Sequence, residues 1–161
     1  MLYCLLRQGY IAALAPQGAP LADIVVSDTS CRRLCTIQVK SRRFGRSRGW
    51  VLKARHEQSV EGLFFCFVDI PEDVTSAPTV YVIPSEIVAE AVYQTHRKYL
   101  SQPGKHGQKK QDSDVRHLRP DHTVTLGSLA APYVLGWLDP YRNRWDLLGL
   151  DSSPQVDPEA S

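Results

Sequence analysis

The alternation of apolar and polar positions predicts a helix, a series of short strands and then further helices. Apolar residues at helical spacing predict helices over Leu2–Gln8 and Ser85–Leu100, with a short closing helix over Arg142–Leu148. Short apolar or alternating runs predict six strands, over Tyr10–Ala15, Leu21–Ser27, Arg32–Arg43, Trp50–Arg55, Gly62–Ile70 and Thr79–Ile83. This order of elements predicts an α/β (α+β) fold in which helices flank a mixed β-sheet.

The chain length limits how many domains these elements can form. With 161 residues the chain is long enough for one domain with a full core, and we expect that domain to span residues 1–150. The segment 101–122 is rich in Gly, Lys and Gln and is expected to be a mobile basic loop. Residues 151–161 are rich in Ser, Pro and acidic residues and are expected to be a disordered tail.

The composition of the chain predicts the cellular compartment of the protein. Hydrophobic residues make up 43% of the chain and charged residues 22%, and no apolar run approaches the length of a membrane span. The N-terminal apolar patch has neither a basic leader nor a small-residue cleavage site, so a cytoplasmic protein without a membrane partner is expected. The four cysteines lack the paired spacing of a zinc site and are interpreted mainly as buried free thiols.

Positive charge is concentrated in one part of the chain. Residues 29–56 contain nine basic residues and no acidic one. A polyanion such as DNA is one partner that this asymmetry fits, and a solvated basic surface is the alternative. If the partner is DNA, phosphate contacts are expected from Arg42, Arg43, Arg46 and Arg48.

Two adjacent strands place candidate catalytic groups together. Along Arg32–Arg43, Cys35, Ile37 and Val39 face one way, while Gln38 and Lys40 face the other. Asp23 lies on the preceding strand, and the short turn between the strands predicts an antiparallel pair. Asp23, Gln38 and Lys40 are therefore expected to meet. A carboxylate and a second oxygen ligand suit Mg²⁺, and a lysine beside them can orient water and offset the charge of a phosphorane.

The segments "RQGY", "APLADIVVSD" and "LCTIQVKSRR" resemble the PD-(D/E)XK nuclease superfamily. The similarity is to small prokaryotic members with a Q-x-K variant, related to Holliday junction resolvase-like and restriction endonuclease-like proteins. It extends over roughly residues 2–150, although its specific part is Asp23 followed by Gln38-Val39-Lys40. This chain departs from the family at Gln38, where Glu is commoner, and has no acidic residue before Asp23, where the leading helix often supplies a Glu.

The resemblance implies a restriction-endonuclease-like fold and a Mg²⁺- or Mn²⁺-dependent DNA endonuclease. It implies that Asp23, Gln38 and Lys40 are catalytic and that Asp23, Gln38 and Val39 bind the metal. His56 is a further candidate for proton transfer because it follows the fourth strand. Two alternatives stay open: a catalytically degenerate nucleic-acid-binding module with the same fold, and a protein-interaction domain. A homodimer is also considered.

Overall fold

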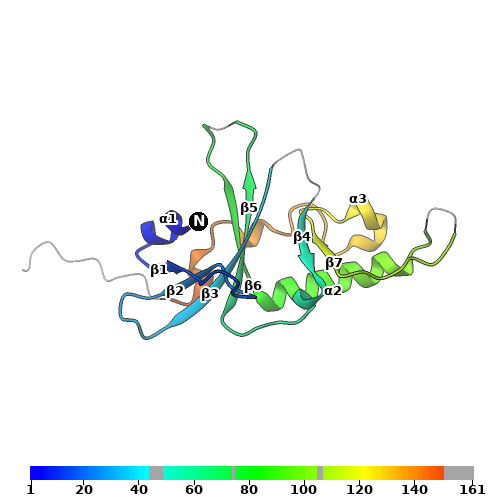
Figure 1. Cartoon of the computed structure of the whole chain (residues 1–161). Coiled ribbons are helices and arrows are strands. Elements are labelled where there is room, and N and C mark those ends of the chain that lie inside the picture. Colours follow the sequence, from blue (N-terminus) through cyan, green and yellow to red (C-terminus); the bar gives the residue numbers. More distant parts are fainter. Residues whose placement is uncertain (44–48, 74, 105–106, 151–161) are drawn as a thin grey trace, which may run out of the picture.

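A five-stranded mixed sheet forms the centre of the computed structural model, which describes residues 1–43, 49–73, 75–104 and 107–150 (Figure 1). Its strand order is β1-β2-β3-β5-β6. The strands are β1 (Ile11–Leu14), β2 (Ile24–Ser27), β3 (Leu34–Arg43), β5 (Leu63–Ile70) and β6 (Thr79–Pro84). Only β3 and β5 pair in parallel; the other neighbours in this sheet are antiparallel. The long strand β3 is therefore the central strand of the sheet.

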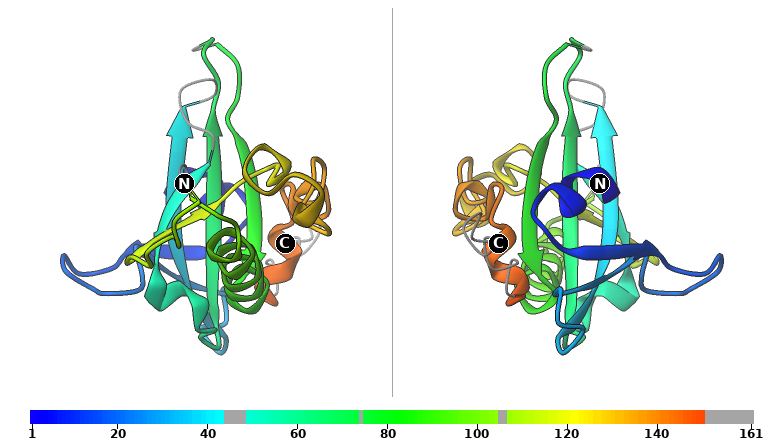
Figure 2. Two further views of the ribbon diagram at one scale, coloured as in Figure 1. Left: turned by 90° about the vertical axis from the view of Figure 1, so that its right-hand side faces the viewer. Right: turned by 90° about the vertical axis from the view of Figure 1, so that its left-hand side faces the viewer.

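The remaining elements pack on both faces of this sheet. A separate antiparallel ribbon is made by β4 (Trp50–Lys53) and β7 (Val115–Leu118). The helices are α1 (Leu2–Arg7), α2 (Ser85–Ser101) and α3 (Thr123–Leu126), with 3₁₀ turns η1 (Ala54–Glu57), η2 (Gly127–Ala130), η3 (Asp139–Tyr141) and η4 (Trp145–Leu148). Figure 2 shows α1 on one side of the sheet and α2 on the other. The predicted fold class, a mixed sheet flanked by helices, is confirmed.

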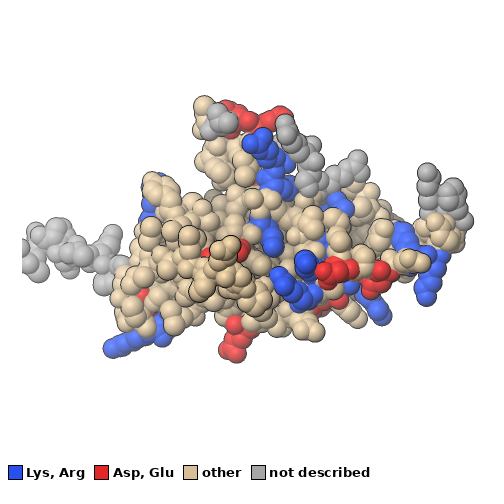
Figure 3. Space-filling model, viewed as in Figure 1, with Lys and Arg blue, Asp and Glu red and all other residues tan. Residues whose placement is uncertain are grey.

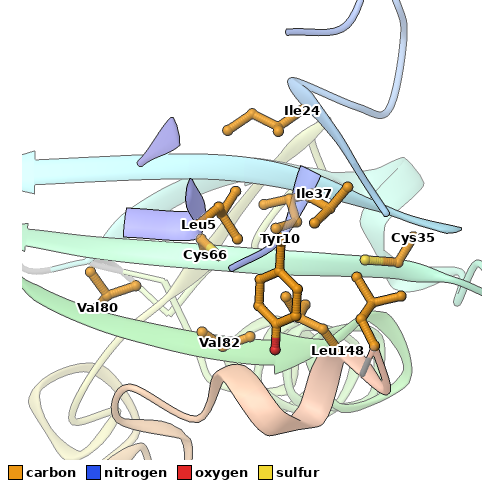
Figure 4. Close-up of a cluster of buried hydrophobic side chains, with 11 residues drawn as sticks. Leu5, Tyr10, Ile24, Cys35, Ile37, Cys66, Val80, Val82 and Leu148 are labelled. Atoms are coloured by element: carbon orange, nitrogen blue, oxygen red, sulfur yellow. The ribbon is translucent and has the colours of Figure 1, made fainter. Parts of the chain in front are cut away.

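One hydrophobic core lies between the sheet and the N-terminal helix. It contains Leu5 of α1, Ile37 of β3, Cys66 of β5 and Leu148 of η4, all almost fully buried (Figure 4). Val39 is partly buried against the same core. The predicted inward face of β3 is therefore confirmed, and its alternation sends the even-numbered side chains to the opposite face.

A second core covers that opposite face. It joins Trp50 and Leu52 of β4 to Phe65 and Phe67 of β5 and to Val88 of α2. The Trp50 and Phe67 ring centroids are 5.1 Å apart, and the Phe65 and Phe67 rings are stacked at 5.7 Å. Because β4 lies on this face, Gln38 is buried and Lys40 is half-buried between the sheet and the ribbon.

Two C-terminal expectations differ from the structure. The segment 101–122, expected to be a loop, contains β7, because Arg116 and Leu118 are buried in alternation with exposed Val115 and His117. The alternation extends over only four residues and is surrounded by polar residues, so the sequence pattern was too short to predict this strand. The closing segment Arg142–Leu148 forms only the turn η4 in its second half, after η3, and the expected tail 151–161 lies outside the described residues.

The helices and the cysteine thiols were both subjects of sequence predictions, and both lie in the described part of the chain. None of the helices there is long and apolar enough to cross a bilayer. Cys35 and Cys66 are buried free thiols, and burial raises the pKa of Cys35 to about 11. Cys31 is an exposed free thiol, unlike the mainly buried positions expected from the sequence.

Candidate active site

Asp23 lies immediately before β2, at the position where the β2–β3 pairing begins. Its backbone N–H donates to the carbonyl of Ile37 at 2.8 Å, which extends the ladder that starts with Ile24 opposite Ile37. The antiparallel pairing predicted for these strands is confirmed. Continuing this register places Asp23 opposite Gln38, and residues directly opposite in a sheet share a face. Asp23 and Gln38 therefore lie on the face that also carries Lys40.

The turn between these strands holds the hairpin in this register. One carboxylate oxygen of Asp28 accepts hydrogen bonds from the Ser30 hydroxyl at 2.9 Å and from the Arg32 backbone N–H at 3.0 Å. Asp28 is almost completely buried. A short polar side chain that bonds the backbone a few residues on is typical of tight turns. The turn thereby fixes which residues of β3 face Asp23.

The Asp23 carboxylate is oriented by the backbone of β3. Its Oδ2 accepts the Val39 N–H at 2.7 Å, so the carboxylate leans along the edge of β3 beyond the start of β2. The N–H and carbonyl of one strand residue point to the same edge. The Val39 carbonyl therefore points toward the same side as its N–H, where Asp23 lies. Because the Val39 side chain packs into the first core, only its backbone faces the site.

Gln38 is buried, with 5% of its surface exposed, whereas the sequence had placed it on an open polar face. Its aligned neighbour on β5 is Phe65, and the His56 ring lies edge-on to that phenyl ring at 5.5 Å. The turn η1 therefore covers the part of the sheet that holds Gln38. Within the part of the chain that the structure describes, the Gln38 Oε1 has no hydrogen-bond donor. A buried amide oxygen without a donor costs about 1–3 kcal/mol, so this atom is a strong candidate to accept a ligand.

Lys40 is half-buried two residues further along β3, where it is aligned with Phe67. Burial lowers the pKa of its ammonium group, Asp23 opposes that effect, and the positive charges of Arg55 and Lys53 add to it. Among the described residues, no hydrogen bond or salt bridge is formed by this ammonium group. Asp23, Gln38 and Lys40 thus lie on one face of adjacent strands, as one carboxylate, one amide oxygen and one cation that is free to contact a ligand.

The four arginines predicted to contact phosphate are placed differently from one another. Arg42 forms two hydrogen bonds to Asp69, at 2.5 and 2.7 Å, and its guanidinium carbon lies 4.3 Å from the centroid of the Trp50 ring. With 10% of its side chain exposed, Arg42 is better placed to hold β4 against the sheet than to reach a phosphate. Arg43 is exposed at the end of β3, and Arg46 and Arg48 lie outside the described residues.

His56 is more enclosed than a proton-transfer residue needs to be. It is 3% exposed, its Nδ1 accepts the Lys53 backbone N–H at 3.0 Å, and its Nε2 accepts the Arg55 Nε–H at 3.5 Å. Burial, with help from the positive charges of Arg55 and Lys40, lowers its pKa to about 4. The ring is therefore neutral near pH 7 and shapes the turn η1. Its candidate role in proton transfer stays a prediction.

The donor atoms of the site fit a hard divalent cation. They are the Asp23 carboxylate, the Gln38 Oε1 and the Val39 carbonyl, all oxygens, as Mg²⁺ and Mn²⁺ prefer. Across the described ranges, no group of three or more His, Cys, Asp or Glu side chains could hold a metal. These donors therefore suit a cation that keeps some of its water ligands and takes further ligands from the substrate phosphate. This arrangement is common for Mg²⁺.

Comparisons with known proteins add one structural similarity. No family model matches the chain, and no curated protein matches it. Among solved structures, the chain is similar to a bacterial homing endonuclease, I-Ssp6803I, with a TM-score of 0.43 and 18% sequence identity; the match covers 91% of this chain and 81% of that chain.

Proposed function

We propose that this protein is a divalent-cation-dependent DNA endonuclease of the PD-(D/E)XK type. The observation that supports the proposal is the presence of three groups on one face of adjacent strands: the Asp23 carboxylate, the buried Gln38 oxygen without a donor in the described residues, and the half-buried Lys40 ammonium. Their order along the chain and their positions on an antiparallel hairpin are those that the family resemblance implies. The exposed basic surface around them suits a polyanionic substrate.

The reaction proposed is hydrolysis of a phosphodiester bond. The oxygen of a water molecule attacks phosphorus, the bond from phosphorus to the leaving sugar oxygen breaks, and the departing oxygen gains a proton. Asp23, Gln38 and Val39 would hold Mg²⁺ or Mn²⁺, which when bound supplies Lewis-acid stabilisation of the phosphorane. Lys40 supplies a positive charge to a non-bridging oxygen and positions the attacking water.

The lowered pKa of Lys40 suits the second of these roles. Because burial lowers that pKa, a larger fraction of the side chain is the neutral amine than in an exposed lysine at the same pH. The neutral amine can accept a proton from the attacking water, and the ammonium form can donate to the phosphorane. The negative charge of Asp23 partly offsets this lowering of the pKa.

Cleavage assays on purified protein test the proposal. Plasmid, linear duplex, single-stranded and branched DNA are incubated with Mg²⁺ or Mn²⁺, and we expect cleavage of at least one substrate. Asp23→Ala should abolish cleavage and leave DNA binding nearly unchanged, because the carboxylate contacts metal and not phosphate. Lys40→Ala should slow cleavage roughly 100- to 1,000-fold.

An exposed lysine elsewhere gives the matched control. Lys109→Ala removes the same charge from an exposed position outside the site and should cleave like the wild type. Wild-type protein that cleaves none of the substrates, or Asp23→Ala protein that cleaves normally, would contradict the proposal.

A second candidate function follows from the charge of the site. Asp23 is the single carboxylate among the donors, and Gln38 is neutral, so the site holds one negative charge beside the Lys40 cation. These two charges cancel, so the site offers a divalent cation no net attraction when no substrate is present. A catalytically silent DNA-binding module is therefore the alternative, and it predicts DNA binding without cleavage under any divalent cation.

A further inference from the structure

The segment β4–η1 crosses the sheet face that carries the candidate site. Trp50, at its beginning, lies against Phe67 and over the Arg42 guanidinium. His56, near its end, lies against Phe65. Phe65 and Phe67 are aligned with Gln38 and Lys40 on the parallel neighbour β3. The residues between Trp50 and His56 therefore pass over the stretch of β3 from Arg42 to Gln38.

Two cations of this segment remain on its solvent side. Leu52 is buried beneath it, whereas Lys53 and Arg55 are exposed. Figure 3, in the view of Figure 1, shows basic side chains gathered over β3 and β4, with acidic side chains beside them. Because this segment passes over Lys40, the positive charges of Lys53 and Arg55 add to the lowering of the pKa of the Lys40 ammonium group. Like charges held together repel, and a bound anion removes that repulsion.

The carboxylates nearby do not neutralise this group. Lys53 forms a loose ion pair with Asp114, with Nζ and Oδ2 3.7 Å apart and both side chains more than 60% exposed, and such pairs contribute little. Arg55 forms no salt bridge with any carboxylate in the described ranges; its Nε lies 3.5 Å from the His56 Nε2. With Asp23 and Asp114 counted against the three cations, one positive charge is left over.

We propose that Lys53 and Arg55, together with Lys40, form a phosphate-binding site that holds the DNA backbone against the cleavage centre. Lys40 contacts the phosphate that reacts, and Lys53 and Arg55 contact that phosphate or its neighbour along the same strand. This inference rests on the proposed function for the location of the reacting phosphate, but the binding site itself requires only a phosphodiester backbone. It assigns positions on β4–η1 a role in affinity that the basic segment Arg42–Arg48 does not provide alone.

The salt dependence of DNA binding tests this site without any cleavage. The probe is a short fluorescent duplex of arbitrary sequence, titrated in EDTA across a series of salt concentrations. Removing two phosphate contacts should reduce the slope of log K against log salt by nearly two units and weaken binding roughly 10- to 100-fold at about 0.1 M salt. We expect this for Lys53→Ala/Arg55→Ala. Lys53→Arg/Arg55→Lys should keep the wild-type slope, because both charges are retained.

A matched control separates the site from net charge. Arg32→Ala/Arg97→Ala removes two exposed positive charges, from the β2–β3 turn and the C-terminal half of α2, and should leave the slope within about half a unit of the wild type. An equal loss of slope in this control and in Lys53→Ala/Arg55→Ala would overturn the proposal. So would an unchanged slope in Lys53→Ala/Arg55→Ala.

Combining these changes with Lys40→Ala tests whether the cations share one length of backbone. The loss of binding free energy in Lys40→Ala/Lys53→Ala/Arg55→Ala should be smaller than the sum of the separate losses, because neighbouring contacts depend on one another. Strictly additive losses would contradict a shared site. Because all measurements are made without divalent cation, a wild type that binds as expected yet never cleaves DNA would refute the nuclease and leave this phosphate site standing.

Discussion

At the scale of single residues, the candidate site is marked by polar oxygen atoms that have few hydrogen-bond partners in the described residues. The Gln38 Oε1 is buried and has no donor within the described chain, and the neighbouring Asp23 carboxylate is held by one backbone N–H. An amide oxygen can accept from a donor or coordinate a cation, but it adds no negative charge to attract one. The difference between Gln and Glu at position 38 therefore sets how strongly the site holds a cation before DNA arrives.

Gln38→Glu should tighten the binding of Mg²⁺ in the absence of DNA by about tenfold, because a second carboxylate replaces a neutral ligand. Isothermal titration calorimetry measures this affinity directly, and cleavage at low Mg²⁺ should rise with it. Gln17→Glu, at an exposed turn position, adds the same charge away from the site and serves as control. Equal Mg²⁺ affinity in Gln38→Glu, Gln17→Glu and the wild type would show that position 38 does not face a metal site.

At the scale of elements, β4 is held over the site by a buried ion pair and an aromatic ring. Arg42 and Asp69 are aligned neighbours on β3 and β5, with 10% and 12% of their side chains exposed, and Trp50 covers the guanidinium. The Trp50 Nε1 also donates to the Val68 carbonyl at 3.2 Å. Because β4 leads directly into η1, this anchor fixes the height of Lys53 and Arg55 above Lys40.

Arg42→Ala should lower the free energy of unfolding by about 3 kcal/mol, because it leaves the Asp69 carboxylate unpaired in a largely enclosed position. Urea unfolding followed by tryptophan fluorescence measures the change. Arg144 and Asp146 form a pair of the same type that is largely exposed, so Arg144→Ala should cost much less. If both variants lose equal stability, the Arg42–Asp69 pair does not hold β4 against the sheet.

The sequence revealed the elements of the site better than their contacts. Cys35, Ile37 and Val39 alternate with polar residues clearly enough to assign both faces of β3, and the short turn after Ser27 was enough to predict the antiparallel pair. The burial of Gln38 depends on η1 crossing the sheet, and the pairing of Arg42 depends on Asp69, 27 residues later. Such contacts join elements that are far apart in the sequence. The alternation of apolar and polar residues within one strand cannot reveal them, and it predicts that Gln38 and Arg42 face solvent.

At the scale of the whole molecule, two buried histidines connect stability to pH. His56 and His122 are each 3% exposed, and each accepts a backbone N–H: His56 Nδ1 from Lys53 and His122 Nε2 from Arg119. Burial, with help from nearby arginines, lowers the pKa of each ring to about 4. The unfolded chain, in which histidine has its ordinary pKa of about 6.5, therefore takes up protons first as the pH falls.

The free energy of unfolding should consequently decrease as the pH is lowered from about 6.5 toward 4. Each histidine should contribute a loss of about 2 kcal/mol between pH 7 and pH 5, since one pKa unit corresponds to about 1.4 kcal/mol. Urea unfolding at a series of pH values gives the slope. His56→Asn and His122→Gln keep an acceptor near each N–H without a titrating ring. The double variant should lose most of the slope, and the remainder should come from His117, whose pKa burial also lowers. A double variant with the wild-type slope would rule out these histidines as the cause.

The hydrogen bond from the Val39 N–H to Asp23 makes one backbone proton a reporter of the site. Most amide protons of a central strand are bonded to a neighbouring strand, but this one ends on a side-chain carboxylate at 2.7 Å. In a two-dimensional nitrogen–proton NMR spectrum, the chemical shift of this amide will change when a cation binds that carboxylate. Adding Mg²⁺, or DNA followed by Mg²⁺, should shift the Val39 peak, and the peak should already be displaced in Asp23→Ala. The occupancy of the site can thus be followed at one resolved signal, before any bond in DNA is broken.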